Sequence, residues 1–126
     1  MAVITTFMLV FSSVELIAQN RADDAWKNCQ SQDADRRIIG CTTVVHAKGF
    51  GSRSRLADAL DSRCWAYHVK ERNDLAIADC EAAIAINPSY PYAYNNLSAA
   101  LLGIGDYARA IDAANKSIEL KPQFLW

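Results

Sequence analysis

Apolar residues recur at helical spacing along the C-terminal half of the chain. In residues 92–105, Leu97 and Leu101 stand four positions apart, as on one face of an amphipathic helix. Residues 74–88 have an equally helical pattern and end on Pro88, which stops a helix because proline lacks the backbone donor. The pattern therefore predicts a helical chain whose helices are separated by prolines and turns.

The same helical pattern occurs three times. Residues 106–122 repeat residues 74–88 after 34 positions, so that Ala76 matches Ala110. Residues 33–45 match them at an interval of 39 positions, and the additional residues fall in a segment that contains glycine and serine. The predicted order is a degenerate repeat at about 22–47, a loop at 48–55, a repeat at about 56–88, a repeat at about 91–122 and the start of a further repeat at 123–126.

These landmarks resemble the tetratricopeptide-repeat family over residues 22–126. In the last repeat the family's aromatic, leucine, glycine, tyrosine, alanine, leucine and proline positions hold Tyr94, Leu97, Gly105, Tyr107, Ala110, Leu120 and Pro122. In the middle repeat the matching residues are Leu60, Cys64, Tyr67, Ala76, Ala83 and Pro88. Arg63 stands where leucine is usual. Glu71 stands where glycine is usual, so a looser turn is expected there.

The resemblance implies an all-α fold of about three stacked antiparallel helix pairs, which form a short right-handed α-solenoid with a concave face. Small residues such as Ala76 and Ala110 are expected where paired helices approach closely. More narrowly, the chain is similar to small exported bacterial tetratricopeptide proteins.

The N-terminal segment has a composition of its own. An apolar stretch from Ala2 to Phe11, followed by small residues, resembles a secretory signal peptide over residues 1–18, with cleavage after Ala18. The alternatives are a retained first helix and a membrane anchor. No stable membrane span is expected, because the uncharged stretch is shorter than the 18 to 20 residues that a span needs. A periplasmic or secreted location is therefore predicted, and a cytoplasmic one otherwise.

The four cysteines are Cys29, Cys41, Cys64 and Cys80, an even number in a chain that is predicted to be exported. Cys64 and Cys80 lie on either side of the predicted turn near Asn73, where antiparallel packing would bring them together. Cys29 and Cys41 flank a shorter turn. Disulfides within each pair are expected, and the alternative is four buried free thiols. The spacing does not suit zinc, so no metal site is predicted.

Composition, charge and the absence of catalytic motifs argue against some classes of function. The 126 residues are 52% hydrophobic and 21% charged, which is typical of one folded domain, and the net charge of −1 gives no reason to expect nucleic acid as a partner. Lys48, Arg53 and Arg55 are predicted to lie in a solvated loop. Asp58 and Asp61 are predicted to be acids on the helix surface rather than a catalytic pair. No catalytic motif is found, so neither enzymatic activity nor a cofactor is expected.

The predicted function is that of a noncatalytic interaction module that binds a peptide or a partner protein on its concave face. The candidate residues are Trp26, Asp61, Trp65, His68, Tyr92 and Asn95. Alternatively, both tryptophans pack between adjacent helix pairs. Asn96 matches one position of the carboxylate-binding members of the family, but the basic positions are missing, so capture of a terminal carboxylate is not expected.

Self-association is the alternative function. The last repeat is followed by the beginning of another one and has no polar capping helix after it. Three explanations are open: Phe124, Leu125 and Trp126 cover the exposed end, a second chain covers it in a homo-oligomer, or the chain is a truncated form of a longer repeat protein.

Overall fold

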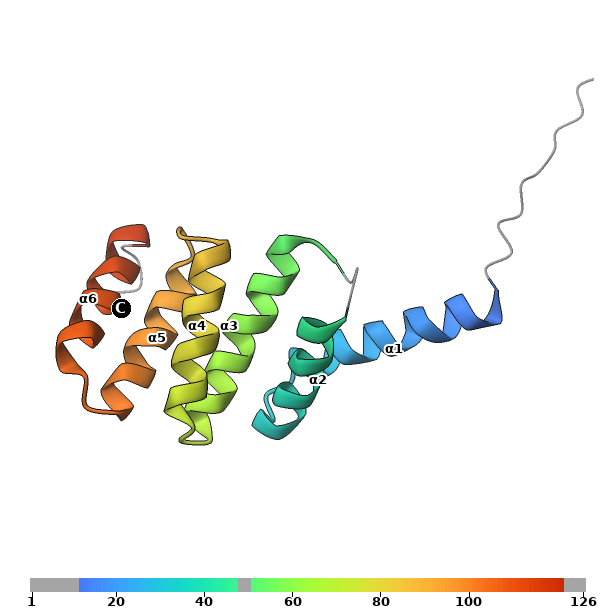
Figure 1. The fold of residues 1–126 in the computed structure, drawn as a ribbon, viewed down its shortest axis with the longest axis horizontal. Coiled ribbons are helices and arrows are strands. Elements are labelled where there is room, and N and C mark those ends of the chain that lie inside the picture. Colours follow the sequence, from blue (N-terminus) through green and yellow to red (C-terminus); the bar gives the residue numbers. More distant parts are fainter. Residues whose placement is uncertain (1–11, 48–50, 122–126) are drawn as a thin grey trace, which may run out of the picture.

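The computed structural model describes residues 12–47 and 51–121, and all regular structure in these ranges is helical. The helices are α1 (Ser13–Cys29), α2 (Ala34–His46), α3 (Arg53–Val69), α4 (Asn73–Ile86), α5 (Pro91–Gly103) and α6 (Tyr107–Leu120). Figure 1 shows them as consecutive pairs joined by short turns. Helix pairs α3–α4 and α5–α6 stack side by side, and α2 packs against α3. This confirms the predicted all-α arrangement of stacked pairs.

Helix α1 differs from the others because part of it projects beyond the stack (Figure 1). Its buried residues are Ala22, Ala25 and Cys29, whereas every described residue before Ala22 is exposed. Only the C-terminal half of α1 therefore contributes to the core. The predicted cleavage position after Ala18 lies within the exposed half, and residues 1–11 of the predicted signal peptide lie outside the described residues.

With the exception of α4, the described helices begin at residues that suit a helix N-terminus. Ser12, Asp33, Ser52 and Asp106 each accept a hydrogen bond from a backbone N–H of the first turn, and Pro91 opens α5. Because Ser52 caps α3, the helix starts three residues before the end of the predicted loop. The assignment of Arg53 and Arg55 to a loop was therefore wrong. Lys48 lies outside the described residues.

The turn after α3 is as tight as the turn after α5, contrary to the expectation from Glu71. Glu71 adopts the left-handed conformation at φ 58°, and Gly105, 34 residues later, does so at φ 79°. The hydrogen bonds also match: the Arg72 N–H donates to the Tyr67 carbonyl at 2.8 Å, and the Asp106 N–H donates to the Leu101 carbonyl at 3.0 Å. Packing of the two helices thus holds Glu71 in a conformation that glycine adopts more readily.

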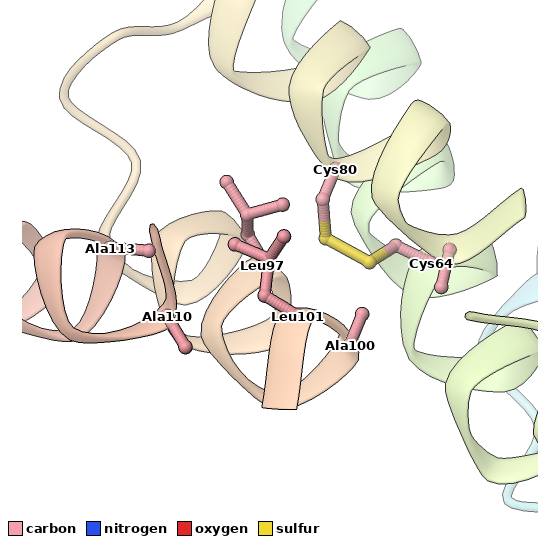
Figure 2. Close-up of a cluster of buried hydrophobic side chains, with 8 residues drawn as sticks. Cys64, Cys80, Leu97, Ala100, Leu101, Ala110 and Ala113 are labelled. Atoms are coloured by element: carbon pink, nitrogen blue, oxygen red, sulfur yellow. A yellow bond between two sulfur atoms is a disulfide. The ribbon is translucent and has the colours of Figure 1, made fainter. Parts of the chain in front are cut away.

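Small side chains fill the contacts between paired helices. Ala76, Ala83 and Ala110 are almost completely buried, and the Ser98 hydroxyl donates to the Ala110 carbonyl at 2.8 Å. The main cluster joins the middle pair to the last one around Leu97 and Leu101 of α5 (Figure 2). Its buried members are Cys64, Ala76, Cys80, Leu97, Ala100, Leu101, Ala110 and Ala113.

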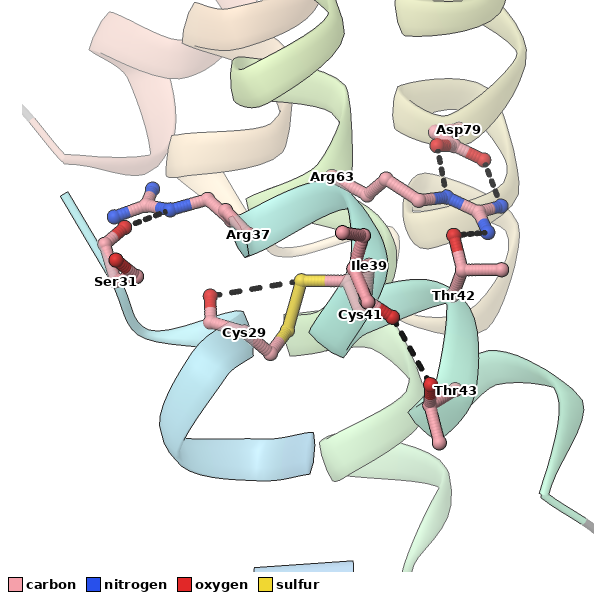
Figure 3. Close-up of a disulfide and its surroundings, with 9 residues drawn as sticks. All are labelled: Cys29, Ser31, Arg37, Ile39, Cys41, Thr42, Thr43, Arg63 and Asp79. Carbon is pink, nitrogen blue, oxygen red and sulfur yellow. Dashed lines mark hydrogen bonds and ion pairs between the residues drawn. A yellow bond between two sulfur atoms is a disulfide. The ribbon is translucent and has the colours of Figure 1, made fainter. Parts of the chain in front are cut away.

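Each of the first two pairs carries a disulfide between its helices. Cys29 and Cys41 join α1 to α2 with their Cα atoms 4.5 Å apart, and Cys64 and Cys80 join α3 to α4 at 5.4 Å. Both pairings were candidates from the sequence, and all four side chains are buried. Figure 3 shows the first disulfide beside the α1–α2 turn.

Arg63, which takes the place of the usual leucine, forms an ion pair inside the stack. Its Nε and Nη2 donate to the carboxylate of Asp79 at 2.7 and 2.8 Å, and its Nη1 donates to the hydroxyl of Thr42 at 3.1 Å (Figure 3). The Arg63 and Asp79 side chains are only 12% and 10% exposed. The last repeat holds the buried Leu97 and Ala113 at the same two positions. One repeat therefore uses an ion pair where the next uses apolar residues.

Gly40 allows α1 and α2 to approach closely. A Cβ atom at this position would lie 2.6 Å from the Ala25 carbonyl oxygen and 2.7 Å from the carbonyl carbon of Asn28. Because both are backbone atoms, Gly40→Ala is expected to lower the free energy of unfolding by about 2–3 kcal/mol, measured by urea unfolding. The control is Gly103→Ala, whose Cβ would first meet the end of the flexible side chain of Asn73. Equal losses in both variants would contradict this explanation.

Candidate functional site

The candidate site is the surface formed by the first helix of each pair, α1, α3 and α5, which we call the inner face. The six predicted residues come from these three helices. The structure places them in different surroundings.

Trp26 packs against the first helix pair and is not freely exposed for a partner to contact. It is half-buried against the cluster of Cys29, Cys41 and Ala59. The guanidinium of Arg55 lies over its ring, 5.0 Å from the centroid. Since Arg55 and Ala59 belong to α3, Trp26 joins α1 to α3. Trp26 therefore packs between adjacent helix pairs, which was the alternative expectation for the two tryptophans.

Trp65 is half-buried and is also covered by an arginine of a neighbouring helix. The guanidinium of Arg37 on α2 lies 4.2 Å from the centre of its ring. The Nε of Arg37 donates to the Ser31 carbonyl at 2.6 Å, which ties the stack to the α1–α2 turn (Figure 3). Burial lowers the pKa of Arg37. A ligand that contacts this ring must share it with Arg37 or displace it.

Asp61 is buried at the contact between α3 and α5, so the prediction that it is a surface acid was wrong. It is 8% exposed, and its carboxylate accepts a hydrogen bond from Asn96 at 2.8 Å. One turn earlier, Asp58 accepts a hydrogen bond from the hydroxyl of Tyr90 at 2.8 Å. Burial raises the pKa of Asp61, and burial also raises the pKa of Tyr90. Asp61 therefore positions the two helices and presents little surface to a partner.

The raised pKa of Asp61 makes a testable prediction about stability. A carboxyl whose pKa is higher in the folded state than in the unfolded state favours folding when it is protonated, and this contribution is lost as the pH rises through the folded-state pKa. Asp61→Asn is therefore expected to be more stable than the wild type at pH 7. The advantage should vanish near pH 3, where Asp61 is protonated in both states. Thermal unfolding of both proteins across this pH range measures the difference, and an advantage that is independent of pH would contradict the explanation.

His68 lies at the end of α3, beside a hollow in the surface. Its Nδ1 is 2.8 Å from the Oδ1 of Asn73. Around this contact is a hollow of about 580 Å³, lined by His68, Val69, Glu71, Asn73 and Gly103. Val69 and His68 belong to α3 and Gly103 to α5, so the hollow lies between the α3–α4 turn and the C-terminal end of α5.

Tyr92 and Asn95 are exposed on the first turns of α5. The Lys121 ammonium donates to the hydroxyl of Tyr92 at 2.7 Å and lies 4.7 Å from the centre of its ring. Tyr90 meets Tyr92 edge to face, with ring centroids 6.2 Å apart. These two predicted residues are the ones that present side chains to solvent most fully.

The six residues do not form one compact site. Trp26 lies near Arg55 at the beginning of α3, whereas His68 lies thirteen residues further along the same helix, about 20 Å away by helical rise. Sequence reasoning missed Arg37 and Tyr90, which contact the inner face from other parts of the chain. Asn96 matches one carboxylate-binding position of the family. In the structure its side chain donates a hydrogen bond to Asp61.

The described residues contain no group of three or more histidine, cysteine, aspartate or glutamate side chains that could hold a metal ion. Among the helices of residues 12–47 and 51–121, none is both long enough and apolar enough to cross a membrane.

Comparison with protein families agrees with the helix pairs. Residues 80–112 match a tetratricopeptide repeat, from the middle of α4 through α5 into α6. This part of the chain carries a tetratricopeptide repeat. No curated protein matches it. The repeat supports a role in protein–protein interaction and is typical of noncatalytic proteins.

Proposed function

We propose that this tetratricopeptide-repeat protein binds an extended segment of a partner protein along the part of the inner face formed by α3 and α5, without catalysing a reaction. The observation that supports this proposal is a row of exposed or half-buried side chains along each helix. Tyr92, Asn95 and Leu102 follow one face of α5 at intervals of three and seven residues. Trp65 and Val69 follow one face of α3.

The two rows are neighbours, because the Asp61–Asn96 hydrogen bond joins α3 to α5 between them. Val69 is 50% and Leu102 is 53% exposed, which leaves an apolar pair at one end of the surface. Tyr92 lies at the other end, about 15 Å away by the rise of α5. An extended segment of about five residues covers that length. Its apolar side chains would contact Val69 and Leu102, and its polar groups would contact Asn95.

Selection from a displayed library of random twelve-residue peptides tests the proposal. Peptides that are selected by the wild type are expected to lose at least tenfold in affinity for Leu102→Glu, because a charge would be buried against their apolar side chains. The control is Ile39→Glu, which changes an exposed apolar residue on α2, outside the inner face. Binding that survives Leu102→Glu, or that is lost in the control, would contradict the proposed location.

We also propose that the protein is exported. Two disulfides are typical of extracytoplasmic proteins. Cleavage after Ala18 would remove no buried residue, because burial in α1 begins at Ala22. The chain from residue 19 onward is therefore expected to unfold at the same temperature as the full chain. The mass of the protein recovered from the expressing cell reports whether cleavage occurs, and an uncleaved chain with free thiols would overturn the proposal.

Self-association is supported by one comparison between the repeats. Ile77 packs against the core, whereas its equivalent in the last repeat, Ile111, is 59% exposed. A second chain that covered this end of the stack would bury Ile111. Residues 122–126, the other group in this prediction, lie outside the described residues. Sedimentation over a range of concentrations tests the idea, and a monomer at every concentration would exclude it.

A further inference from the structure

The hollow between the α3–α4 turn and the end of α5 has a consistent chemical character. Its lining residues contribute hydrogen-bond acceptors and a negative charge. Glu71 supplies a carboxylate, and Gly103 brings the C-terminal end of α5, where the helix dipole is negative. None of the five lining residues is a lysine or an arginine.

The contact between His68 and Asn73 adds another acceptor. The Asn73 Oδ1 only accepts hydrogen bonds, so this contact is a hydrogen bond in the tautomer of His68 whose Nδ1 carries the proton. In the neutral ring, Nε2 is then left as an acceptor. Gly103 makes this arrangement possible, since a Cβ atom there would collide with the Asn73 amide group.

The cations nearest in sequence are held elsewhere. The Lys70 ammonium pairs with Asp35 of α2 at 3.1 Å. The guanidinium of Arg72 lies over the ring of Tyr67, 5.3 Å from its centre. Both residues flank Glu71 in the sequence, yet each is engaged with another helix or ring. Within the described residues, Glu71 makes no ion pair.

We propose that this hollow binds a basic side chain, lysine or arginine, of the segment that docks on the inner face. The apolar stem would pack against Val69, and the charged end would reach Glu71 and His68 Nε2. This inference rests on the proposed function, because Val69 belongs both to the hollow and to the apolar pair with Leu102. It specifies that one side chain of the partner segment is basic.

A small-molecule titration tests this inference without a partner protein. The ¹⁵N-labelled full chain is titrated with N-acetyl-arginine amide, with N-acetyl-lysine amide and with the neutral N-acetyl-glutamine amide. The two basic compounds are expected to shift the amide signals of Glu71, Asn73 and Gly103, and the neutral one is not. Added salt should weaken the shifts, because the attraction is electrostatic.

Matched substitutions test whether the carboxylate of Glu71 attracts the basic compounds. Glu71→Gln is expected to weaken binding of the basic compounds about fivefold, the effect of removing one partly exposed charge partner. Glu81→Gln, which removes an exposed carboxylate of α4 that pairs with Arg109, should leave binding unchanged. The proposal is overturned if the glutamine compound binds equally well, if Glu71→Gln has no effect, or if no signal shifts at saturating concentration.

The two proposals can fail separately. Loss of the arginine response with peptide binding intact would refute the basic-side-chain site alone. An arginine response in a protein whose selected peptides are insensitive to Leu102→Glu would refute the inner-face proposal alone.

Discussion

Asp79→Ala is expected to lower the free energy of unfolding by about 3–5 kcal/mol, the largest loss among the single substitutions proposed. The substitution leaves the guanidinium of Arg63 buried between helices without a carboxylate, in contact with only the Thr42 hydroxyl and the ring of Tyr67. A domain of this size has a total stability of about 5–15 kcal/mol, so the loss is a large part of it. Urea unfolding of the protein with both disulfides intact, followed by circular dichroism, measures the change.

The chain itself supplies the matched control. The double variant Arg63→Leu with Asp79→Ala copies Leu97 and Ala113, the residues at the same positions of the last repeat. It is expected to lie within about 1 kcal/mol of the wild type, because a buried ion pair can be replaced by apolar residues at little cost. A double variant as unstable as Asp79→Ala would show that the loss does not come from an unpaired charge.

Removal of the Cys29–Cys41 disulfide is the second change with a large expected effect. The cross-link closes a loop of 12 residues, so Cys29→Ala with Cys41→Ala should lose about 3 kcal/mol. The loss should be local, because each repeat contacts only its neighbours and α1 meets α3 mainly through Trp26. Hydrogen exchange is expected to show the amides of α1 and α2 opening before those of α4 and α5.

Removal of the Cys64–Cys80 disulfide should behave differently. The loop of 16 residues gives a similar loss of about 3 kcal/mol. These sulfur atoms, however, lie in the cluster that joins the middle pair to the last one (Figure 2). Cys64→Ala with Cys80→Ala should therefore shift the unfolding of α3 to α6 as a unit. Early opening of α1 and α2 in this variant, but not in the other, would contradict the assignment.

Most helix boundaries could be predicted from the sequence because their causes are local. Pro88 marks the connection after α4, and Asp106 caps α6. The extent of the loop at 48–55 was overestimated, since Ser52 was not recognised as the cap of α3. The turn at Glu71 was also misjudged, because a family preference for glycine does not reveal how strongly helix packing can impose a left-handed residue.

The surroundings of the candidate site depend on contacts between distant residues. Asp61 and Asn96 are 35 positions apart and Arg37 and Trp65 are 28 apart, so no local pattern pairs them. Helical spacing placed the six candidates on the first helices of the pairs. It could not show that arginines cover both tryptophans or that Asp61 is buried.

By itself the sequence determined the repeat and the helical class, because both follow from spacing along one chain. It offered the two cysteine pairings as candidates beside free thiols, and the family resemblance implied a role in protein interaction. The tertiary structure alone decided which inner-face side chains remain accessible. It also brought His68, Glu71 and Gly103 around one hollow. The physical reason is that exposure and charge pairing depend on how neighbouring helices pack, and these helices are separated by whole repeats in the sequence.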